Sequence, residues 1–397
     1  MKRSASMMKC DREGRLLQRQ LRAGLRLPPP RRCFASSYLP PHDSQKRSSS
    51  HRVIFSGIQP TGTPHIGNYL GALQPWKKLH DEADANTSLI FCIVDLHAIT
   101  TQHDAAILRV RKREMLAALL AIGLDPSRCT LFYQSSVPAH SELQWILSCQ
   151  ASTGYLSRMT QWKTKLRGNS TSGPDPSMAT DRLKHGLFSY PILQAADVLV
   201  HRATHVPVGE DQRQHLEFAR ECVTNFHAAY SGNIFPYPET LVSPARRIMS
   251  LRNSVQKMSK SAESAKSRIE LTDDAKTVRE RIAAALTDDR GGVTWEPEAR
   301  PGVTNLLEIL AAFCGAPEVS ARELAEGEMK GVSMRELKER VAEKVSEGLG
   351  GIQERYREVR KRGDGYLDEV AEEGRIKAAR SAEETMRLVK EAVGLGL

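Results

Sequence analysis

Short apolar runs alternate with longer amphipathic stretches in the first third of the chain. The apolar runs span 53–56, 88–94 and 130–134, and each has the length and composition of a buried strand. Residues 66–80 and 105–122 instead repeat their apolar positions at helical spacing. Strands that alternate with helices predict an α/β fold with a doubly wound parallel sheet. Ligands of such sheets bind at the carboxyl ends of the strands.

The rest of the sequence is predicted to be mainly helical. A helical insertion follows the third strand, and its polar stretch at 163–184, rich in Gly, Ser and Pro, is typical of a flexible surface loop. The apolar positions of 265–397 keep helical spacing, which predicts an all-helical C-terminal domain. Capping-box sequences, which begin a helix, occur at Ser333 and Ser381.

The excess of positive charge is concentrated at the N-terminus. The net charge is +10, but residues 1–50 hold 12 Lys and Arg against 3 Asp and Glu, and residues 51–397 hold 45 against 44. The first segment is rich in Arg and Ser and has leucines at helical spacing, which favours a cleaved or disordered mitochondrial presequence over a plain basic tail. No apolar run reaches the roughly 18 residues of a membrane span, so no membrane association is expected.

Two polar motifs, about 190 residues apart, indicate a phosphate-binding site. The first, HIGN at His65–Asn68, follows a Gly- and Pro-rich turn, and backbone N–H groups at a helix start can hold phosphate oxygens. The same His and Asn could serve only as helix caps. The second, KMSKS at Lys257–Ser261, gathers two cations and two hydroxyls on one loop, for which a solvated lysine loop is the alternative. Together, and in this order, the motifs favour a site that uses ATP.

These motifs resemble the HIGH-type and KMSKS signatures of the class I aminoacyl-tRNA synthetases. Longer segments resemble the tryptophanyl-tRNA synthetases of bacteria and organelles, namely 55–62, 65–72, 91–100, 195–197, 206–212 and 247–250. The resemblance covers roughly residues 52–397, with the stretch near 163–184 outside it. It implies a Rossmann-type, HUP-like catalytic domain over 51–264, with the KMSKS loop at 257–261, and a tRNA anticodon-binding domain over 265–397.

The reaction implied by the resemblance is ATP-dependent attachment of L-tryptophan to its tRNA. A tryptophanyl-adenylate and pyrophosphate form first, and transfer to tRNA then releases AMP. Lysines on flexible stems suit the charge that grows on pyrophosphate. The catalytic residues are expected to be His65, Asn68, Lys257, Ser259 and Lys260. The ATP contacts are expected to be Gln59, Pro60, Thr61, Gly67, Asn68, Gly209, Glu210, Asp211, Ile248, Lys257, Met258, Ser259, Lys260 and Ser261.

Tryptophan recognition follows from indole chemistry. The ring is large and apolar with a single N–H donor, so a selective pocket needs apolar walls and one acceptor. The resemblance implies that Asp197 is the acceptor, and its apolar flanks favour a buried functional carboxylate over an ordinary ion pair. Gln194 stands where many bacterial members carry Met, a change that could alter affinity or the contacts of Asp197. The other contacts implied are Phe55, His97, Tyr190, Val206, Val208 and Gln212.

Metal chemistry has little support in the sequence. Mg²⁺ is expected to enter with ATP and to have few direct protein ligands. No zinc site is expected, because the cysteines form no CxxC pair. His201 and His205 have i, i+4 spacing, but no third ligand is apparent, so a structural role is favoured.

The resemblance also implies a homodimer in the mitochondrial matrix whose partner is tRNA(Trp). The most basic cluster of the helical region, Arg357 with Arg360–Arg362, fits a tRNA contact and a solvated helix face equally. Three alternatives stay open. A small-molecule nucleotidylyltransferase with HxGH chemistry is disfavoured by the helical C-terminal domain. A tyrosyl-tRNA synthetase shares the fold and both signatures, although the VPVGEDQ run at 206–212 argues against it. A synthetase-derived RNA-binding or splicing protein without catalysis is disfavoured by the intact signatures.

Overall fold

The computed structural model describes residues 51–163, 183–209, 212–230, 232–242, 247–260, 262, 264–314 and 319–396. Residues Ser49–Leu397 form one compact unit. The predicted presequence and nearly all of the predicted loop near 163–184 lie outside the described residues. The division of the folded part at residue 264 stays a prediction.

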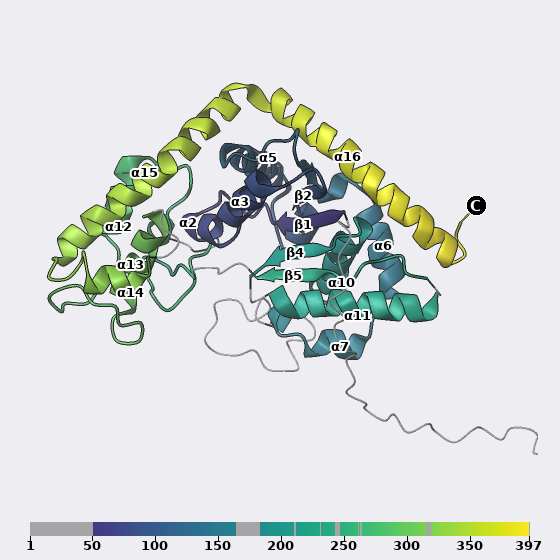
Figure 1. The fold of residues 1–397 in the computed structure, drawn as a ribbon, viewed down its shortest axis with the longest axis horizontal. Coiled ribbons are helices and arrows are strands. Elements are labelled where there is room, and N and C mark those ends of the chain that lie inside the picture. The colour runs from purple at the N-terminus through teal and green to yellow at the C-terminus, as the bar shows by residue number, and fades with distance from the viewer. Residues whose placement is uncertain are drawn as a thin grey trace, which may run out of the picture. The chain divides into compact units, whose positions relative to one another are not determined.

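A five-stranded parallel sheet forms the centre of the α/β part (Figure 1). Its order is β3-β2-β1-β4-β5, so β1 has its sequence neighbour on one side and a later strand on the other. The predicted doubly wound α/β fold and its three strands are confirmed. The strands are β1 (Arg52–Ile58), β2 (Thr87–Ile93), β3 (Thr130–Tyr133), β4 (His205–Val208) and β5 (Glu239–Val242).

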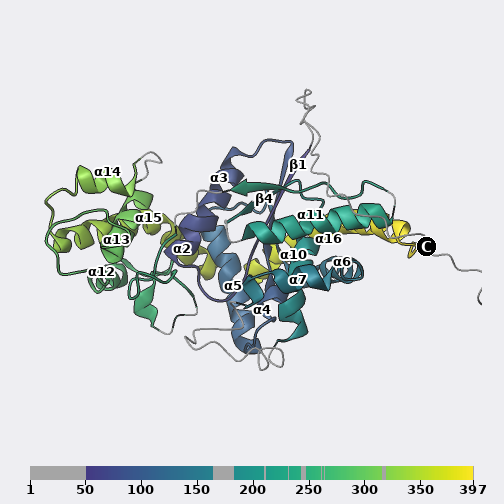
Figure 2. The ribbon, with the colours of Figure 1, turned by 90° about the horizontal axis from the view of Figure 1, so that it is seen from below.

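Successive residues of the strands alternate between two hydrophobic cores, one on each face of the sheet. Ile54 and Phe91 belong to one core, whereas Phe55 and Cys92 belong to the other. This period of two follows from the pleat of a strand, and both faces are apolar because helices cover both (Figure 2). The β1–β2 register, with Phe55 opposite Ile90, therefore fixes which side chains face each layer.

The helices of the α/β part connect and cover these strands. The predicted first helix is continuous but includes a π-helical turn just before Pro75, whose nitrogen has no N–H to donate. The helices are α2 (Ile66–Asn68), the π-helix η1 (Tyr69–Leu73), α3 (Gln74–Glu82), α4 (Asp95–Ala98), α5 (Ala105–Ala121), the 3₁₀-helix η2 (Gln134–Ser136), α6 (Ala139–Ser148), α7 (Thr153–Arg158), α10 (His185–Val200) and α11 (Arg213–Ala229).

Most of the described residues after 264 are helical, as predicted, with a long loop between α12 and α13. Ser333 caps α15 by accepting a hydrogen bond from the Glu336 amide. The helix start predicted at Ser381 is wrong, because Ser381 lies inside the continuous helix α16. The helices are η4 (Ala265–Ser267), α12 (Ala275–Ala283), α13 (Pro301–Phe313), α14 (Ala321–Glu326), α15 (Met334–Lys361) and α16 (Gly363–Ala392).

Helix α16 lies along β3 at the edge of the sheet (Figure 1). Gly374 makes this approach possible: a Cβ on Gly374 would lie 1.7 Å from the carbonyl oxygen of Leu131 in β3. Ala378 and Ala382, one and two turns further on, are also fully buried. A stripe of small residues therefore lets the last helix cover a strand edge that would otherwise expose unpaired backbone groups.

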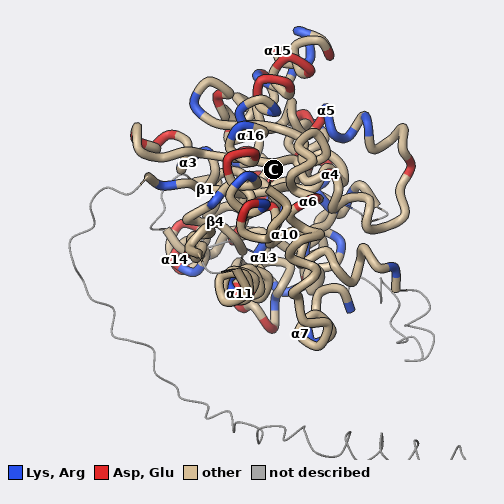
Figure 3. Tube along the Cα trace, turned by 90° about the vertical axis from the view of Figure 1, so that its right-hand side faces the viewer, with Lys and Arg blue, Asp and Glu red and all other residues tan. Residues whose placement is uncertain are grey.

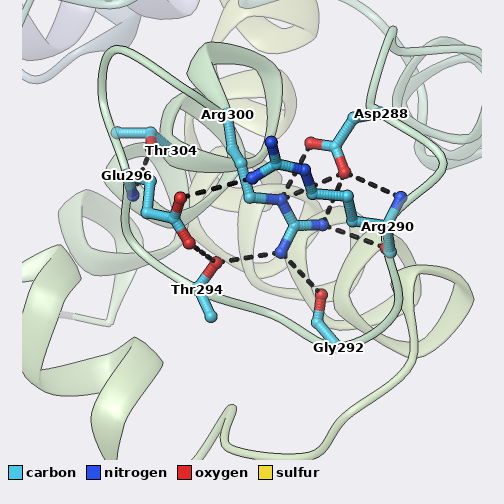
Figure 4. Close-up of polar contacts among 7 residues, drawn as sticks. All are labelled: Asp288, Arg290, Gly292, Thr294, Glu296, Arg300 and Thr304. Atoms are coloured by element: carbon cyan, nitrogen blue, oxygen red, sulfur yellow. Dashed lines mark hydrogen bonds and ion pairs between the residues drawn. The ribbon is translucent and has the colours of Figure 1, made fainter.

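A buried arginine organises the loop between α12 and α13 (Figure 4). Arg300 donates from Nε and Nη2 to the Asp288 carboxylate at 2.9 and 2.7 Å. Its remaining N–H groups donate to the carbonyls of Arg290 and Gly292 and to the Thr294 hydroxyl. All five guanidinium donors are thus used. The loop leads directly into Pro301 at the start of α13, a helix that contacts the site described below.

The described surface carries mixed charge. Lys and Arg positions are interspersed with Asp and Glu positions along the backbone in the view that includes α16 (Figure 3). On α16, Arg375 pairs with Glu372 and Arg387 with Glu391. Within the described part of the chain, no helix has both the length and the apolar character needed to cross a membrane.

Candidate active site

A cavity of about 470 Å³ opens at the carboxyl ends of β1 and β4. The connection after β1 leads toward one edge of the sheet and the connection after β4 leads toward the other. Doubly wound sheets bind ligands at such a point. The size suits a small organic molecule. Ten predicted site residues line it: Phe55, Gln59, His97, Tyr190, Gln194, Asp197, Val206, Val208, Gly209 and Gln212.

Gly57 keeps the cavity open where β1 ends. A Cβ at this position would lie 2.8 Å from Cγ1 of Val94, which follows β2. Gly57 and Val94 both line the cavity, as does Trp76 of α3, which stacks on Phe91 at 4.8 Å between ring centroids. The cavity wall next to the sheet is therefore apolar and closely packed.

Asp197 of α10 lies at the cavity with only 1 % of its surface exposed. Its Oδ1 accepts from Gln134 Nε2 at 2.6 Å and from His140 Nδ1 at 2.7 Å. Its Oδ2 pairs with His97 Nε2 at 3.0 Å. Burial alone would raise the pKa of this carboxyl, but the bonds from His140 and His97 outweigh it and hold the pKa at about 2. Asp197 is therefore an ionised acceptor in an apolar site.

A second polar network borders the cavity on the side of α11. Gln194 donates to Gln212 at 3.2 Å, and Gln212 donates to Gln161 at 3.4 Å. The Tyr190 hydroxyl lies 3.4 Å from Gln161 Oε1 and 3.0 Å from His215 Nε2. Gln194 thus pairs with Gln212, and the contacts of Asp197 come from other residues.

The first motif forms a helix cap. His65 Nδ1 accepts from the Asn68 amide, and Asn68 Oδ1 accepts from the His65 amide, which together make a capping box on α2. Burial, followed by the charges of Lys260, Arg268 and Lys257, lowers the pKa of His65 to about 3. The ring is neutral, and because Nδ1 accepts, its proton is on Nε2. Capping therefore leaves one ring N–H that can donate to a ligand.

The lysine loop is anchored to α13 and to its own preceding segment. Met249 and Lys257 form an antiparallel bridge, and the Met258 amide donates to the Ile248 carbonyl at 3.1 Å. Asn305 of α13 accepts from the Met249 amide at 2.8 Å and donates to the Met249 carbonyl at 3.0 Å. The side chains of Ile248 and Met258 are buried in the core, so they anchor the loop, whereas Lys257 is exposed.

Residues 269–271 connect the two motifs. The Ile66 amide donates to the Ile269 carbonyl, and the Leu271 amide donates to the Pro64 carbonyl, both at 2.9 Å. Gly67 permits close packing here, because a Cβ would lie 3.1 Å from the His65 ring and 3.6 Å from Ile248 Cβ. The start of α2 and the segment that carries the lysine loop are therefore neighbours.

Lys260 joins this motif pair to the cavity. Its Nζ donates to the carbonyl oxygen of Gln59, a cavity residue, at 3.4 Å. Burial, followed by the charge of Arg111, lowers the pKa of Lys260 to about 8. The Thr61 amide donates to the same Gln59 carbonyl at 2.9 Å, and Pro60 between them is buried. Ser259, between the lysines, is partly buried.

The structure thus brings most predicted site residues into two adjoining groups. One lines the cavity, and the other surrounds the start of α2 and the lysine loop. The predicted ATP contacts Glu210, Asp211 and Ser261 lie outside the described residues.

Several residues with contacts to the predicted site were not predicted, among them Gln134, His140, Gln161 and His215. His140 had an available signal, because it occupies a buried position in phase with Leu143 and Leu147 on α6. Gln134 lies in the 3₁₀-helix η2, and Gln161 lies in a helical segment of which 161–163 are described, so neither segment is long enough to show a periodicity.

The two histidines considered for metal binding have different partners. His201 lies 3.3 Å from His140 and from Ser381, whereas His205 contacts Thr204 and Glu239. Across the residues that the structure describes, no group of three or more His, Cys, Asp or Glu side chains is placed to hold a metal ion.

Comparisons with known proteins agree with this geometry. The family model of the class I tRNA synthetases for tryptophan and tyrosine matches residues 47–350. The mitochondrial tryptophan–tRNA ligase of Schizosaccharomyces pombe is 40% identical over 353 residues, which cover 87% of this chain and 96% of that protein. The chain therefore belongs to the class I tRNA synthetase family for tryptophan and tyrosine.

Two solved structures extend the likeness to three dimensions. Tryptophanyl-tRNA synthetase from Mycoplasma pneumoniae has a TM-score of 0.74 at 30% identity and covers 87% of this chain and 98% of its own. The enzyme from Campylobacter jejuni, complexed with ADP and tryptophan, has a TM-score of 0.69 at 31% identity and covers 87% and 100%.

Proposed function

We propose that this protein attaches L-tryptophan to tRNA(Trp) by way of a tryptophanyl-adenylate. The observation that carries the proposal is the ionised Asp197, buried beside an apolar cavity that adjoins the two signature motifs. The tryptophan–tRNA ligase of S. pombe and the tryptophan-bound structure from C. jejuni support the same substrate.

The choice of tryptophan over tyrosine has a physical reason. An indole has one donor and no acceptor, so a carboxylate in an apolar pocket satisfies it completely. A phenol oxygen also accepts and would be left unpaired, because Gln134, His140 and His97 already donate to Asp197. Phe55, Val206 and Val208 supply the apolar walls.

In the first step, a tryptophan carboxylate oxygen attacks the α-phosphorus of ATP. The new oxygen–phosphorus bond forms as the bond to pyrophosphate breaks, and the leaving group takes the electron pair. No general base is needed, because the carboxylate is already ionised. His65 Nε2–H would donate to a phosphate oxygen, and Asn68 would support it at the helix start. Lys257 and Lys260 would stabilise the charge that develops on pyrophosphate.

The nucleotide would extend from the cavity toward the lysine loop. Gln59 and Gly209 line the cavity, and Gly209, just after β4, allows close backbone approach. Pro60, Thr61 and Gly67 are proposed nucleotide contacts between the cavity and the loop. Glu210 and Asp211 are proposed nucleotide contacts beyond Gly209, and Ser259 and Ser261 supply hydroxyls on the loop. Mg²⁺ enters as part of the ATP substrate, bound chiefly by its phosphates.

In the second step, the tryptophanyl group passes to the terminal ribose of tRNA, and AMP leaves. The helical region over 265–397 is the proposed anticodon-binding domain of a homodimer. Its basic cluster is engaged internally: Arg360 pairs with Asp364 and Lys361 with Glu358. Exposed pairs of this kind contribute at most about 1 kcal/mol, so phosphate could replace the carboxylates.

We place this activity in the mitochondrial matrix, where it would serve translation. The support is the basic amphipathic N-terminal segment and the mitochondrial name of the S. pombe relative.

The direct test is pyrophosphate exchange into ATP with each aromatic amino acid. We expect exchange to depend on tryptophan, with kcat/KM for tyrosine lower by about 10³-fold or more, because a mismatched polar group would be buried unpaired. Exchange driven by tyrosine would contradict the substrate assignment, and no exchange with either amino acid would favour a non-catalytic RNA-binding role.

A further inference from the structure

Asp197 is one end of a buried chain of polar contacts that leads away from the cavity. His140 Nδ1 lies 2.7 Å from Asp197 Oδ1, and His140 Nε2 lies 3.3 Å from His201 Nε2. His201 Nδ1 lies 3.3 Å from the Ser381 hydroxyl of α16. The exposed fractions of His140 and His201 are 0% and 2%, so these two side chains are shielded from water, whereas Ser381 is half-buried.

The proton positions along this chain follow from its ionised end. An ionised Asp197 only accepts, so His140 Nδ1 carries a proton. If His140 is neutral, its Nε2 accepts from His201 Nε2–H, and His201 Nδ1 accepts from Ser381. If His140 is charged, each of those two bonds reverses. The N–H that faces Asp197 is the same in both cases.

The donors on Asp197 also determine which of its oxygens can take a ligand. A carboxylate oxygen has two acceptor sites. Oδ1 already accepts from Gln134 and His140, whereas Oδ2 has His97 alone among the described residues. The remaining site is therefore on Oδ2, next to His97, and both Asp197 and His97 line the cavity.

We propose that His140 is a positioning residue for tryptophan selection: its Nδ1–H occupies Oδ1 of Asp197 and leaves Oδ2 as the acceptor for the indole N–H. His201 and Ser381 hold the His140 ring in the required orientation. This inference rests on the proposed function, because it assigns how the indole acceptor of that same site is oriented.

Aromatic packing supports a fixed orientation for both rings. Phe132 contacts His140 and His201, with ring centroids 5.6 and 5.7 Å apart, and Phe55 stacks on His201 at 5.8 Å. Phe55 also lines the cavity. Two buried imidazoles in an apolar core are costly unless every polar atom is bonded, which the chain from Asp197 to Ser381 achieves.

The test compares tryptophan with benzothienylalanine, in which sulfur replaces the indole N–H. His140→Leu keeps the bulk but removes the donor. We expect the tryptophan KM in pyrophosphate exchange to rise about tenfold, as loss of a hydrogen bond to a charged group implies. The preference for tryptophan over the sulfur analogue should fall by a similar factor, about tenfold, while kcat and the ATP KM change less than about threefold.

Three further variants show whether His140 acts by positioning Asp197 or only by packing: one that restores the donor at residue 140, and two on α16. His140→Asn places an amide N–H where Nδ1 was, so we expect the preference to return to within about threefold of wild type. Ser381→Ala, at a half-buried position, should raise the tryptophan KM about two- to fivefold without opening the core. Thr385→Ala removes another hydroxyl from α16, one that donates to the Ser381 carbonyl, and should leave the tryptophan KM unchanged.

The outcomes are distinct. If the wild type is active but His140→Leu and Ser381→Ala leave the preference for tryptophan unchanged, this inference is wrong and the proposed function still stands. The same holds if the His140→Leu protein loses kcat, ATP affinity and thermal stability together and is not rescued by Asn. A wild type with no tryptophan-dependent exchange overturns the proposed function and this inference with it.

Discussion

The pKa values of two ionisable side chains at the signature motifs are lowered, which favours their neutral forms. The consequences differ between the two residues. The pKa of His65 is lowered to about 3, so its ring is neutral near pH 7, and its Nε2–H can donate a hydrogen bond without adding charge. Lys260, with a pKa near 8, is charged at pH 7 but close to the point of losing its proton. Burial is the main cause in both cases, and it also makes the remaining charge of Lys260 act through a medium that screens it weakly.

Lys260 should give the reaction a measurable pH dependence. A lysine is charged below its pKa, so the cation is lost as pH rises through about 8. The kcat/KM for ATP in pyrophosphate exchange, which reports the free enzyme, should therefore fall above that pH.

Two variants check the assignment of this pH dependence. Lys260→Arg, which stays charged, should remove the fall. Lys260→Ala should lower exchange by about 10²–10³-fold below pH 8, as loss of one transition-state donor does, and this deficit should shrink at higher pH, where the wild-type lysine is itself neutral. The same fall in the Arg variant, or full activity in the Ala variant, would assign the charge stabilisation to another group.

The residues of the site were predictable only where they belong to long motifs. Asp197, Phe55 and the lysine loop could be recognised because the order of their neighbours is distinctive. The buried phase of His140 on α6 was readable, but its contact with Asp197, 57 positions later, was not, because only the packing of α6 on α10 creates it. Gln194 was expected to alter tryptophan affinity or the contacts of Asp197. It pairs with Gln212 on the cavity wall, and its effect on affinity stays a prediction.

Among the secondary-structure elements, α16 shows how a helix from the end of the chain completes the sheet. Small residues on one side let it approach β3, and its Ser381 reaches His201 at the end of α10. The second anchoring element is α13, whose Asn305 holds the backbone before the lysine loop. Both helices belong to the region predicted as a separate domain, yet they contact the α/β part.

The approach of α16 predicts opposite effects for two glycine substitutions. Gly374→Ala would place a Cβ against the Leu131 carbonyl, and overpacking of this kind costs about 1–3 kcal/mol of unfolding free energy. Gly350→Ala, inside α15 with open space around it, should stabilise by about 0.5–1 kcal/mol. Denaturant unfolding of both variants checks this. Equal effects would show that α16 does not pack closely on β3 in solution.

Elements were predictable where a pattern was long. The first three strands and the helices over 66–80 and 105–122 follow from periodicity, whereas β4 and β5 have four residues each, and β4 includes His205 and Pro207. The capping box expected at Ser381 failed because a Ser-x-x-Glu sequence also occurs inside helices. There, burial of Ala378, Ala382 and Val389 favours continuation over a helix start.

At the scale of the whole molecule, the site depends on segments from most of the chain. The sheet provides the cavity, α10 provides Asp197, and residues 248–271 connect the lysine loop to the start of α2. Neither motif alone determines a substrate. We propose that the buried ionised carboxylate next to them selects an amino acid whose side chain has a single N–H donor.

The measurement that tests the account most directly is attachment of labelled amino acids to defined tRNA transcripts. We predict that the protein, with ATP and Mg²⁺, transfers tryptophan to tRNA(Trp) and leaves tRNA(Tyr) uncharged. We also predict that Asp197→Ala abolishes measurable charging while the protein remains folded. Transfer of tyrosine, or undiminished tryptophan charging by the Asp197→Ala variant, would contradict the central claim that the buried carboxylate selects the indole.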